Sequence, residues 1–440
     1  MMTNIRGYAL GASLVLSQLA LFTPLPAAQE PQQDPPREWI DRDTGHRVVR
    51  LSDEPGSQSL YFHQNAYTPG GAKLVITTPT GLATIDLKTR AIEKVVDGRV
   101  NLIMTGRKTG RAYYIKAGAV YAVDLDTKVS RLIATLPARG SIATVNADET
   151  LLAGTITDGA VPGAPAPGTA PSINVPPSRE PAVTSPAGQP QRGRDSYPGK
   201  GSMMEQRLAA RVPMQLFVLD VKTGAVTTIL RSTDWLNHLQ FSPTDPALLL
   251  FCHEGPWHKV DRTWTIRADG TGLTQIHHRT MNMEIEGHEF FGADGRQIWY
   301  DLQTPRSEVF WLAGYELATG RRTWYHLERS EWSVHFNQSP DGTLFAGDGG
   351  GPSSVAAPGN GQWIYLFRPQ LVPDRTDNTL ANAKDLIQPG VLKAEKLVNL
   401  ARHDYSLEPN VTFTPDMRWI VFRSNMFGPT HVFAVEVSKK

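Results

Sequence analysis

A tight turn between two β-like runs recurs seven times along the chain, and this repeat constrains the fold more than any other feature. The turns lie at Thr68–Gly71, Gly106–Gly110, Asn146–Glu149, Ser242–Asp245, Gly292–Gly295, Ser339–Gly342 and Thr414–Asp416. Their spacing is roughly 40–50 residues where nothing is inserted, which is the length of a four-stranded propeller blade. The repeat therefore predicts an all-β fold, a seven-bladed β-propeller.

A second hairpin recurs later in the same unit. The segments "ATIDLKTRAIEKVV", "YAVDLDTKVSRLI" and "FVLDVKTGAVTTIL" place alternating apolar residues on both sides of an Asp/Thr turn, and "TIRADGTGLTQI" and "GYELATGRRTWYHL" follow the same plan. This pattern is typical of a β-hairpin. The stretch "HRVVRLS" near the N-terminus is a spare strand, which we expect to complete the last blade and close the ring.

The N-terminal segment resembles a secretory signal peptide. Arg6 supplies a positive charge, the run from Tyr8 to Phe22 is largely apolar, and two small residues follow at Ala27 and Ala28. We expect a cleaved signal peptide at residues 1–28, with an uncleaved anchor as the alternative. The mature protein is then periplasmic or secreted and has no membrane span.

Two insertions interrupt the predicted propeller, which extends over residues 40–440. The segment at about 159–201 is rich in Pro, Gly and Ser and poor in apolar residues, so it predicts a disordered surface loop. The segment from Pro373 to Val391 predicts a shorter, partly helical insertion.

The composition argues against a nucleic-acid partner. The chain has 44 Lys and Arg residues against 43 Asp and Glu residues, and it lacks the basic stripe of a nucleic-acid-binding protein. The single cysteine, Cys252, follows an apolar run and predicts a buried strand thiol.

Histidines recur at one position of the repeat. Five residues before the Pro of the first turn, or its equivalent, the chain has His238, His288, His335, Asn410 and Gln64. These positions open the innermost strand of each blade, so in a propeller they gather at one mouth of the central channel. Three of 12 histidines at one repeat position favour a shared site over isolated hydrogen-bonded residues.

The residue types at this mouth suit a divalent metal. Imidazole nitrogen binds Mn, Zn, Fe, Ni or Cu, and carboxylate or amide oxygen favours harder ions. Glu408 lies two residues before Asn410 and therefore on the same strand face. Tyr405 is just upstream, near the same mouth. The predicted metal-binding residues are His288, His335, His403, Glu408 and Asn410.

Loops at the same mouth carry arginines. The stretch "CHEGPWHKVDRTW" contains His253, His258 and Arg262, "QTPRSEV" contains Arg306, and "FRSNMFG" contains Arg423. Arginine forms paired hydrogen bonds with a carboxylate, so three arginines at corresponding loops predict an anionic ligand. The loop "AGDGGG" is expected to be flexible and to line the pocket.

Four stretches resemble the oligogalacturonate lyase family (pectate lyase family 22). They are "CHEGPWHKVD", "EGHEFFGADG", "SVHFNQSPDGTLFAGDGG" and "EPNVTFTPDMRWIVFRSN", and the resemblance runs from about Tyr61 to the C-terminus outside the Pro-rich insertion. It implies a seven-bladed propeller that uses a divalent metal, typically manganese, to cleave short oligogalacturonides by β-elimination. It also implies that His288 binds the metal and that His238 is the base, with His253 and His258 as alternatives.

The chain departs from the family pattern near its last turn. The family has two histidines, two residues apart, with a glutamine upstream, whereas this chain has Glu408, Asn410 and Tyr405. A non-catalytic TolB-like or WD40-like propeller that serves as a binding module is the alternative, because a fold does not determine a function. A propeller-containing serine peptidase is excluded, because the chain has no G-x-S-x-G motif and no room for a hydrolase domain after the seventh unit.

Overall fold

The computed structural model describes residues 34–159, 200–352, 360–375, 377 and 379–439. The predicted signal peptide and almost all of the predicted Pro-rich insertion lie outside these residues. Residues 36–440 form one compact unit, which contains all the strands and helices of the described residues.

Strands are the main secondary structure of this unit, and all of their pairings except β21 with β25 are antiparallel. In chain order they are β1 (Glu38–Ile40), β2 (Arg47–Arg50), β3 (Lys73–Thr78), β4 (Gly81–Asp86), β5 (Ile92–Asp97), β6 (Asn101–Thr105), β7 (Arg111–Lys116), β8 (Ala119–Asp124), β9 (Ser130–Thr135), β10 (Gly140–Val145), β11 (Leu151–Thr157), β12 (Met214–Asp220), β13 (Val226–Ser232), β14 (Trp235–Phe241), β15 (Leu248–Glu254), β16 (Thr263–Arg267), β17 (Thr274–Gln275), β18 (Ile285–Phe291), β19 (Gln297–Gln303), β20 (Phe310–Glu316), β21 (Arg322–Leu327), β22 (Phe336–Gln338), β23 (Phe345–Gly347), β24 (Trp363–Leu371), β25 (Gln388–Asn399), β26 (Thr412–Phe413), β27 (Trp419–Ser424) and β28 (His431–Glu436).

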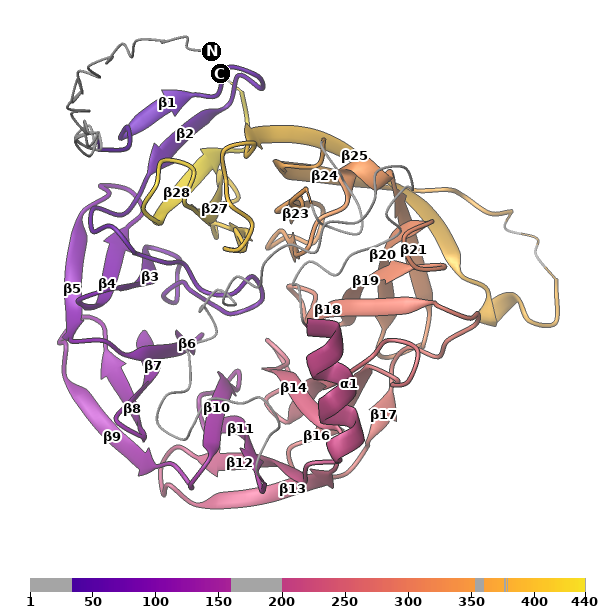
Figure 1. Ribbon diagram of the computed structural model, residues 1–440, viewed down its shortest axis with the longest axis horizontal. Coiled ribbons are helices and arrows are strands. Elements are labelled where there is room, and N and C mark those ends of the chain that lie inside the picture. Colours follow the sequence, from indigo (N-terminus) through magenta and orange to yellow (C-terminus); the bar gives the residue numbers. More distant parts are fainter. Residues whose placement is uncertain (1–33, 160–199, 353–359, 376, 378, 440) are drawn as a thin grey trace, which may run out of the picture. The chain divides into compact units, whose positions relative to one another are not determined.

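These strands form seven blades around a common centre, as predicted (Figure 1). Five sheets form one blade each, and an eight-stranded sheet forms two blades that are joined by parallel pairing of β21 with β25. The first strands of successive blades, such as β6, β10, β14 and β18, lie nearest the centre (Figure 1). The seven predicted turns each connect the first and second runs of a blade.

The ring is closed by the spare N-terminal strand. Strand β2 pairs with β28, with Val48 opposite Val435 and Arg50 opposite Phe433, and β1 pairs with β2 in turn. The predicted role of "HRVVRLS" is therefore confirmed. Closure joins residues from the two ends of the propeller in one blade and removes exposed sheet edges.

Aspartate fixes the recurring outer hairpins. In the β4–β5 hairpin, Asp86 Oδ1 accepts hydrogen bonds from the backbone N–H groups of Lys88 and Thr89, at 3.0 and 2.7 Å. Asp124 and Asp220 occupy the same place in the β8–β9 and β12–β13 hairpins. An aspartate that bonds to the backbone two and three residues ahead stabilises a turn, which explains the recurring Asp/Thr pattern.

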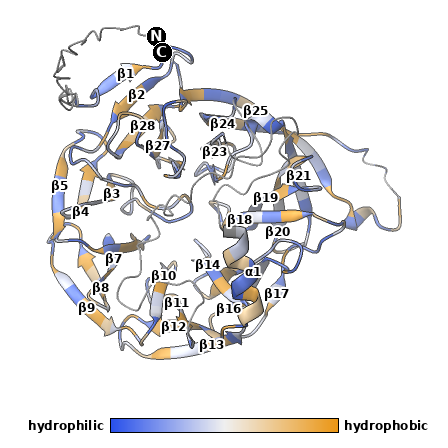
Figure 2. Ribbon diagram, viewed as in Figure 1, coloured by the Kyte–Doolittle hydropathy of each residue, from blue (hydrophilic) through white to orange (hydrophobic). Residues whose placement is uncertain are grey.

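The core lies between the blades. Large aromatic side chains such as Tyr113, Phe217, Tyr300 and Phe433 are fully buried there. Cys252 is also buried, as predicted. The outer strands β5 and β9 contain both polar and apolar residues (Figure 2), and most of their residues are exposed or only partly buried.

One α-helix, α1 (Lys200–Ala210), is present in the described part of the chain, and the repeat pattern did not predict it. Among the described residues of the later insertion, the helical structure is a short 3-10 helix, Ala383–Asp385, and β25 begins at Gln388. Another 3-10 helix spans Arg329–Glu331. Within the described residues, the helices are too short and too polar to cross a lipid bilayer.

Candidate active site

Three of the repeat-position residues have an unusual backbone. His238, His288 and Asn410 have φ angles of 51°, 47° and 55°, in the left-handed region that non-glycine residues rarely occupy. His238 and His288 also lie in β-bulges, where the pairing of β14 with β15 and of β18 with β19 shifts register. A bulge redirects a side chain, and strained backbone of this kind concentrates at functional sites.

His288 and His335 form a pair, and an aspartate orients each ring. His288 Nδ1 lies 2.9 Å from Asp301 Oδ1, and His335 Nδ1 lies 2.7 Å from Asp348 Oδ2. The two rings are edge to face, with centroids 4.9 Å apart. An imidazole that donates its Nδ1–H to a carboxylate keeps the Nε2 lone pair for a metal, as in many metalloproteins.

Glu408 adds a carboxylate to this histidine pair. Its Oε2 lies 3.7 Å from His335 Nε2, and Tyr61 Oη lies 3.1 Å from the same nitrogen. Burial lowers the pKa of His335, but the neighbouring Asp348 and Glu408 carboxylates outweigh it, and the net shift is upward. Two imidazoles and a carboxylate are donor types that suit Mn, Fe or Zn. Within the described residues, however, the group that brings its potential ligand atoms within 4.8 Å of one another is another one, His238, Cys252 and Glu254.

His238 lies beside the pair, with its ring centroid 6.5 Å from that of His288. Its Nε2 is 3.4 Å from Glu254 Oε2, and its Nδ1 is 3.8 Å from Glu289 Oε1. Burial lowers the pKa of His238 to about 4, although both carboxylates oppose the shift. The ring is therefore neutral near pH 7 and can accept a proton.

Arg262 was predicted to bind substrate. It is not among the residues that line the large cavity described below. Its guanidinium is buried, with Nε 3.0 Å from Glu289 Oε2 and Nη1 3.4 Å from Glu254 Oε1. The arginine compensates the two carboxylates that flank His238. Without it, two carboxylates would be buried beside a neutral ring at a large desolvation cost.

His238, Cys252 and Glu254 place potential ligand atoms within 4.8 Å of one another, which makes them a second candidate metal group. In the protein without a metal, burial raises the pKa of the Cys252 thiol well above its usual range. The Arg262 cation also contacts Glu254.

A cavity with about 2350 Å³ of space, including the solvent at its mouth, opens beside His238, Glu254 and Glu408, whereas His288 and His335 are not among its lining residues. It is lined by residues from several blades and from α1, among them Gln58, Tyr61, Arg99, Asn101, Met203, Trp235, Asn237, His238, Glu254, Glu408 and Arg423. Arg423 is thus the only one of the three predicted arginines on its wall. Its Nε donates to the Glu408 carbonyl oxygen and its Nη1 to Gln58 Oε1.

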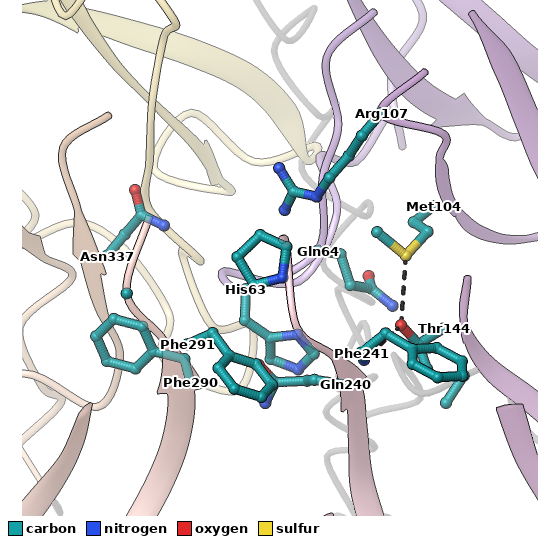
Figure 3. Close-up of a pocket in the computed structure, with 13 residues that line it drawn as sticks. His63, Gln64, Met104, Arg107, Thr144, Gln240, Phe241, Phe290, Phe291 and Asn337 are labelled. Atoms are coloured by element: carbon teal, nitrogen blue, oxygen red, sulfur yellow. Dashed lines mark hydrogen bonds between the residues drawn. The ribbon is translucent and has the colours of Figure 1, made fainter. Parts of the chain in front are cut away.

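A second, narrower cavity lies at the centre of the ring, because residues from six blades line it (Figure 3). His63, Gln64 and Ala143 line both cavities and therefore lie where the two meet. Burial lowers the pKa of His63 to about 3, and the nearby His238 and His335 add to the shift. Gln64 was predicted to face the channel, and it does.

Three residues predicted near the metal use their polar atoms elsewhere. Asn410 accepts a hydrogen bond from the Phe62 N–H and donates one to the Glu408 carbonyl. His403 bonds through Nδ1 to Ser424 Oγ and through Nε2 to the Leu407 carbonyl, so both ring nitrogens are engaged. Tyr405 donates to the Asp348 carbonyl. The structure does not support the prediction that His403 and Asn410 are ligands.

The two alternative bases also lie away from the cavity. His253 is on the opposite face of β15 from Glu254, and its ring packs against Trp264 at 5.3 Å. His258 is half exposed, with Nε2 3.9 Å from Glu205 Oε1. Arg306, predicted to bind substrate, lies over the Trp257 ring at 4.9 Å and does not line the cavity.

The sequence pattern missed the carboxylates that support the histidines. Glu289 directly follows His288 in the stretch "EGHEFFGADG", and Glu254 follows His253 in the stretch "CHEGPWHKVD". Both glutamates were therefore part of stretches that the sequence analysis had used. Asp348 belongs to "AGDGGG", which was expected to be a flexible pocket loop. It is instead fully buried and holds His335 through the backbone and the ring.

A model of the family described as oligogalacturonate lyase matches residues 205–440. The chain is 28% identical over 240 residues to an oligogalacturonate lyase of Dickeya dadantii (strain 3937), covering 51% of this chain and 55% of the relative. It is 27% identical over 245 residues to an oligogalacturonide lyase of Pectobacterium atrosepticum, with the same coverage. The chain therefore spans about half the length of the curated relatives it matches.

Solved structures support the fold over a larger part of the chain. A structure described as oligogalacturonate lyase in complex with manganese aligns with 91% of this chain and 96% of its own, with a TM-score of 0.68 and 22% identity. An oligogalacturonate lyase from Vibrio parahaemolyticus aligns with the same coverage, a TM-score of 0.67 and 20% identity. At this identity the likeness shows a shared fold.

Proposed function

Because the chain belongs to the oligogalacturonate lyase family, we propose that it cleaves short oligogalacturonides, the fragments of pectin, by β-elimination. The observation that carries this proposal is the position of His238. Its neutral ring lies on the cavity wall, beside two aspartate-oriented histidines and the Glu408 carboxylate. Abstraction of a proton beside a carboxylate requires a base, and it requires a cation nearby to neutralise the developing charge.

The reaction begins with loss of a proton that is weakly acidic. The C5–H bond of a uronate lies next to a carboxylate that is already negative, so the developing charge must be neutralised. His238 takes the C5 proton, and the C5–H electron pair becomes the C4–C5 double bond. The C4–O bond breaks, its electron pair leaves with the oxygen, and that oxygen takes a proton from solvent. The products are a shortened chain and an unsaturated uronate.

We propose that His288, His335 and Glu408 would hold a divalent metal, manganese by analogy with the related lyase structure. When bound it supplies Lewis-acid stabilisation of the charge on the substrate carboxylate. Asp301 and Asp348 hold the two imidazoles through Nδ1, which leaves Nε2 as the metal-binding atom, and a metal on His335 would displace the Tyr61 hydroxyl that lies 3.1 Å from its Nε2. In this chain Glu408 and Asn410 stand where the family pattern has two histidines and Tyr405 where it has a glutamine, and His335 compensates by adding an imidazole.

Arg423 is the arginine that we assign to substrate binding. It is buried at the cavity wall, and its bonds to the Glu408 carbonyl and Gln58 fix its orientation. A guanidinium held in this way can form charge-assisted hydrogen bonds with a uronate carboxylate. Arg99, on the same wall, is a second cation that the sequence pattern did not single out.

We further propose that the protein is exported, with cleavage near Ala28. The charge of Arg6, the apolar run that follows it and the small residues at the end of the segment support this. N-terminal sequencing of protein purified from the periplasm or medium should begin near Gln29, and an intact Met1 would contradict export by a cleaved signal.

The direct test of the activity uses purified protein and digalacturonate. With added Mn²⁺, ultraviolet absorbance of the C4–C5 double bond should rise, and EDTA should abolish the rise. If no oligogalacturonide yields an unsaturated product at any metal concentration, the substitutions at Glu408 and Asn410 have changed the function. A propeller that binds ligands without catalysis then becomes the better account.

A further inference from the structure

Helix α1 is fixed over the fourth blade by contacts along its length. Met204 is buried, and the Arg207 guanidinium lies 4.2 Å over the ring of Trp235 at the start of β14. Glu205 Oε2 lies 2.7 Å from Lys259 Nζ, in the loop after β15. Figure 1 shows α1 beside β14 and β16. The helix is therefore a fixed boundary of the cavity next to His238.

Met203 is the residue that α1 contributes to the cavity wall. It lines the cavity together with Trp235, and 39% of its surface remains exposed. The neighbouring wall residues Asn237, His238 and Glu254 are polar. Met203 and Trp235 thus add apolar surface to the cavity whose wall also contains the proposed base, His238.

We propose that Met203 and Trp235 form a sugar-binding wall, which packs against the ring carbons of the uronate next to the one that loses its C5 proton. The inference rests on the proposed function. A pyranose ring has C–H faces as well as polar edges, so its binding site needs apolar surface beside hydrogen-bonding groups. The wall flanks His238, where the adjoining sugar of a dimer must lie when the base reaches C5.

Two features suit these side chains to that role. Methionine is flexible and polarisable, so it adapts to a ring surface. Arg207 lies against Trp235 and restrains its indole ring, which favours one orientation for stacking. Met203 also lies just before residues 205–440, the segment that matches the family model, so the helix adds to the site from outside that segment.

The test compares Met203→Ala with Met281→Ala as the matched control. Met281 is 44% exposed and does not line the cavity. Met203→Ala should raise KM for digalacturonate about 3- to 10-fold with kcat changed less than about 2-fold, because it removes contact with bound substrate rather than with the reacting atoms. Met203→Leu should have a KM close to that of the wild type, and the KM of Met281→Ala should be unchanged. Thermal unfolding midpoints should be close to wild type in all three variants.

The outcomes separate this proposal from the function on which it rests. If the wild type makes unsaturated product and Met203→Ala has an unchanged KM, the wall proposal is wrong and the lyase proposal stands. If the wild type makes no product, calorimetric titration with digalacturonate decides. If Met203→Ala then binds digalacturonate more weakly than Met281→Ala does, the sugar-binding wall is supported although the lyase proposal is wrong. If the two variants bind equally, or neither binds, both the wall proposal and the lyase proposal are wrong.

Discussion

The Oε2 atom of Glu254 lies 3.4 Å from the Nε2 atom of His238, and the same carboxylate contacts the buried Arg262. The proposed base is therefore not isolated in its pocket. It sits against a carboxylate whose charge an arginine balances, and this carboxylate raises the pKa of His238 against the larger effect of burial.

Replacement of His238 by alanine should remove most of the activity. A positioned general base contributes about 10²- to 10⁴-fold to the rate, so kcat for digalacturonate should fall by that factor. Metal content should stay at the wild-type level, because His288 and His335 are unchanged. His253→Ala is the control, since that ring packs against Trp264 on the other face of the strand. Full activity in His238→Ala would place the base elsewhere.

The pH profile should report the depressed pKa of His238. Because the free enzyme's His238 has a pKa of about 4, kcat/KM should rise with pH through that value as the ring loses its proton. A bound uronate carboxylate favours the protonated ring, so the rise in kcat should occur at higher pH.

Glu254→Gln should move the acid side of the kcat/KM profile to lower pH. Glu254 raises the pKa of His238 against the larger effect of burial, and a neutral amide removes that contribution. Initial rates measured at fixed ionic strength would show the shift. A move to higher pH would mean that another group controls this part of the profile.

The metal set can be checked by elemental analysis. His288→Ala and His335→Ala should each lose bound manganese, and Asp301→Asn should weaken metal affinity about 10- to 100-fold, because Asp301 orients the His288 ring. His258→Ala is the control, as this half-exposed histidine lies outside the site. Retained metal in both histidine variants would direct attention to the group formed by His238, Cys252 and Glu254.

The repeat predicted the fold well because each blade is a local structure with a local signal. The Asp/Thr turn that begins at Asp86 holds its own hairpin through bonds within three residues, so a short stretch of sequence reveals it. Helix α1 was missed for the opposite reason. It follows the Pro-rich insertion, breaks the strand repeat, and is held by contacts such as Arg207 with Trp235 that no local pattern shows.

The site was predicted in part. His238, His288 and His335 converge because the repeat position fixes where a side chain lies around the channel. The role of an arginine, by contrast, depends on which carboxylates it meets after folding. Arg262 turns inward to Glu289, whereas Arg423 reaches the cavity wall.

Arg262→Met should therefore destabilise the protein rather than weaken substrate binding. The change leaves Glu254 and Glu289 buried without their cation, and breaking such a pair costs about 3–5 kcal/mol in the free energy of unfolding. Burial raises the pKa of Glu289, but Arg262 and His238 outweigh it, so the wild-type pKa is lowered. Without Arg262 burial should raise that pKa, so the deficit in stability should be largest at neutral pH and shrink as the carboxylates become protonated in acid. Urea unfolding at pH 7 and at pH 5 measures both effects. A variant that is as stable as wild type but has a raised KM would show that Arg262 binds substrate after all.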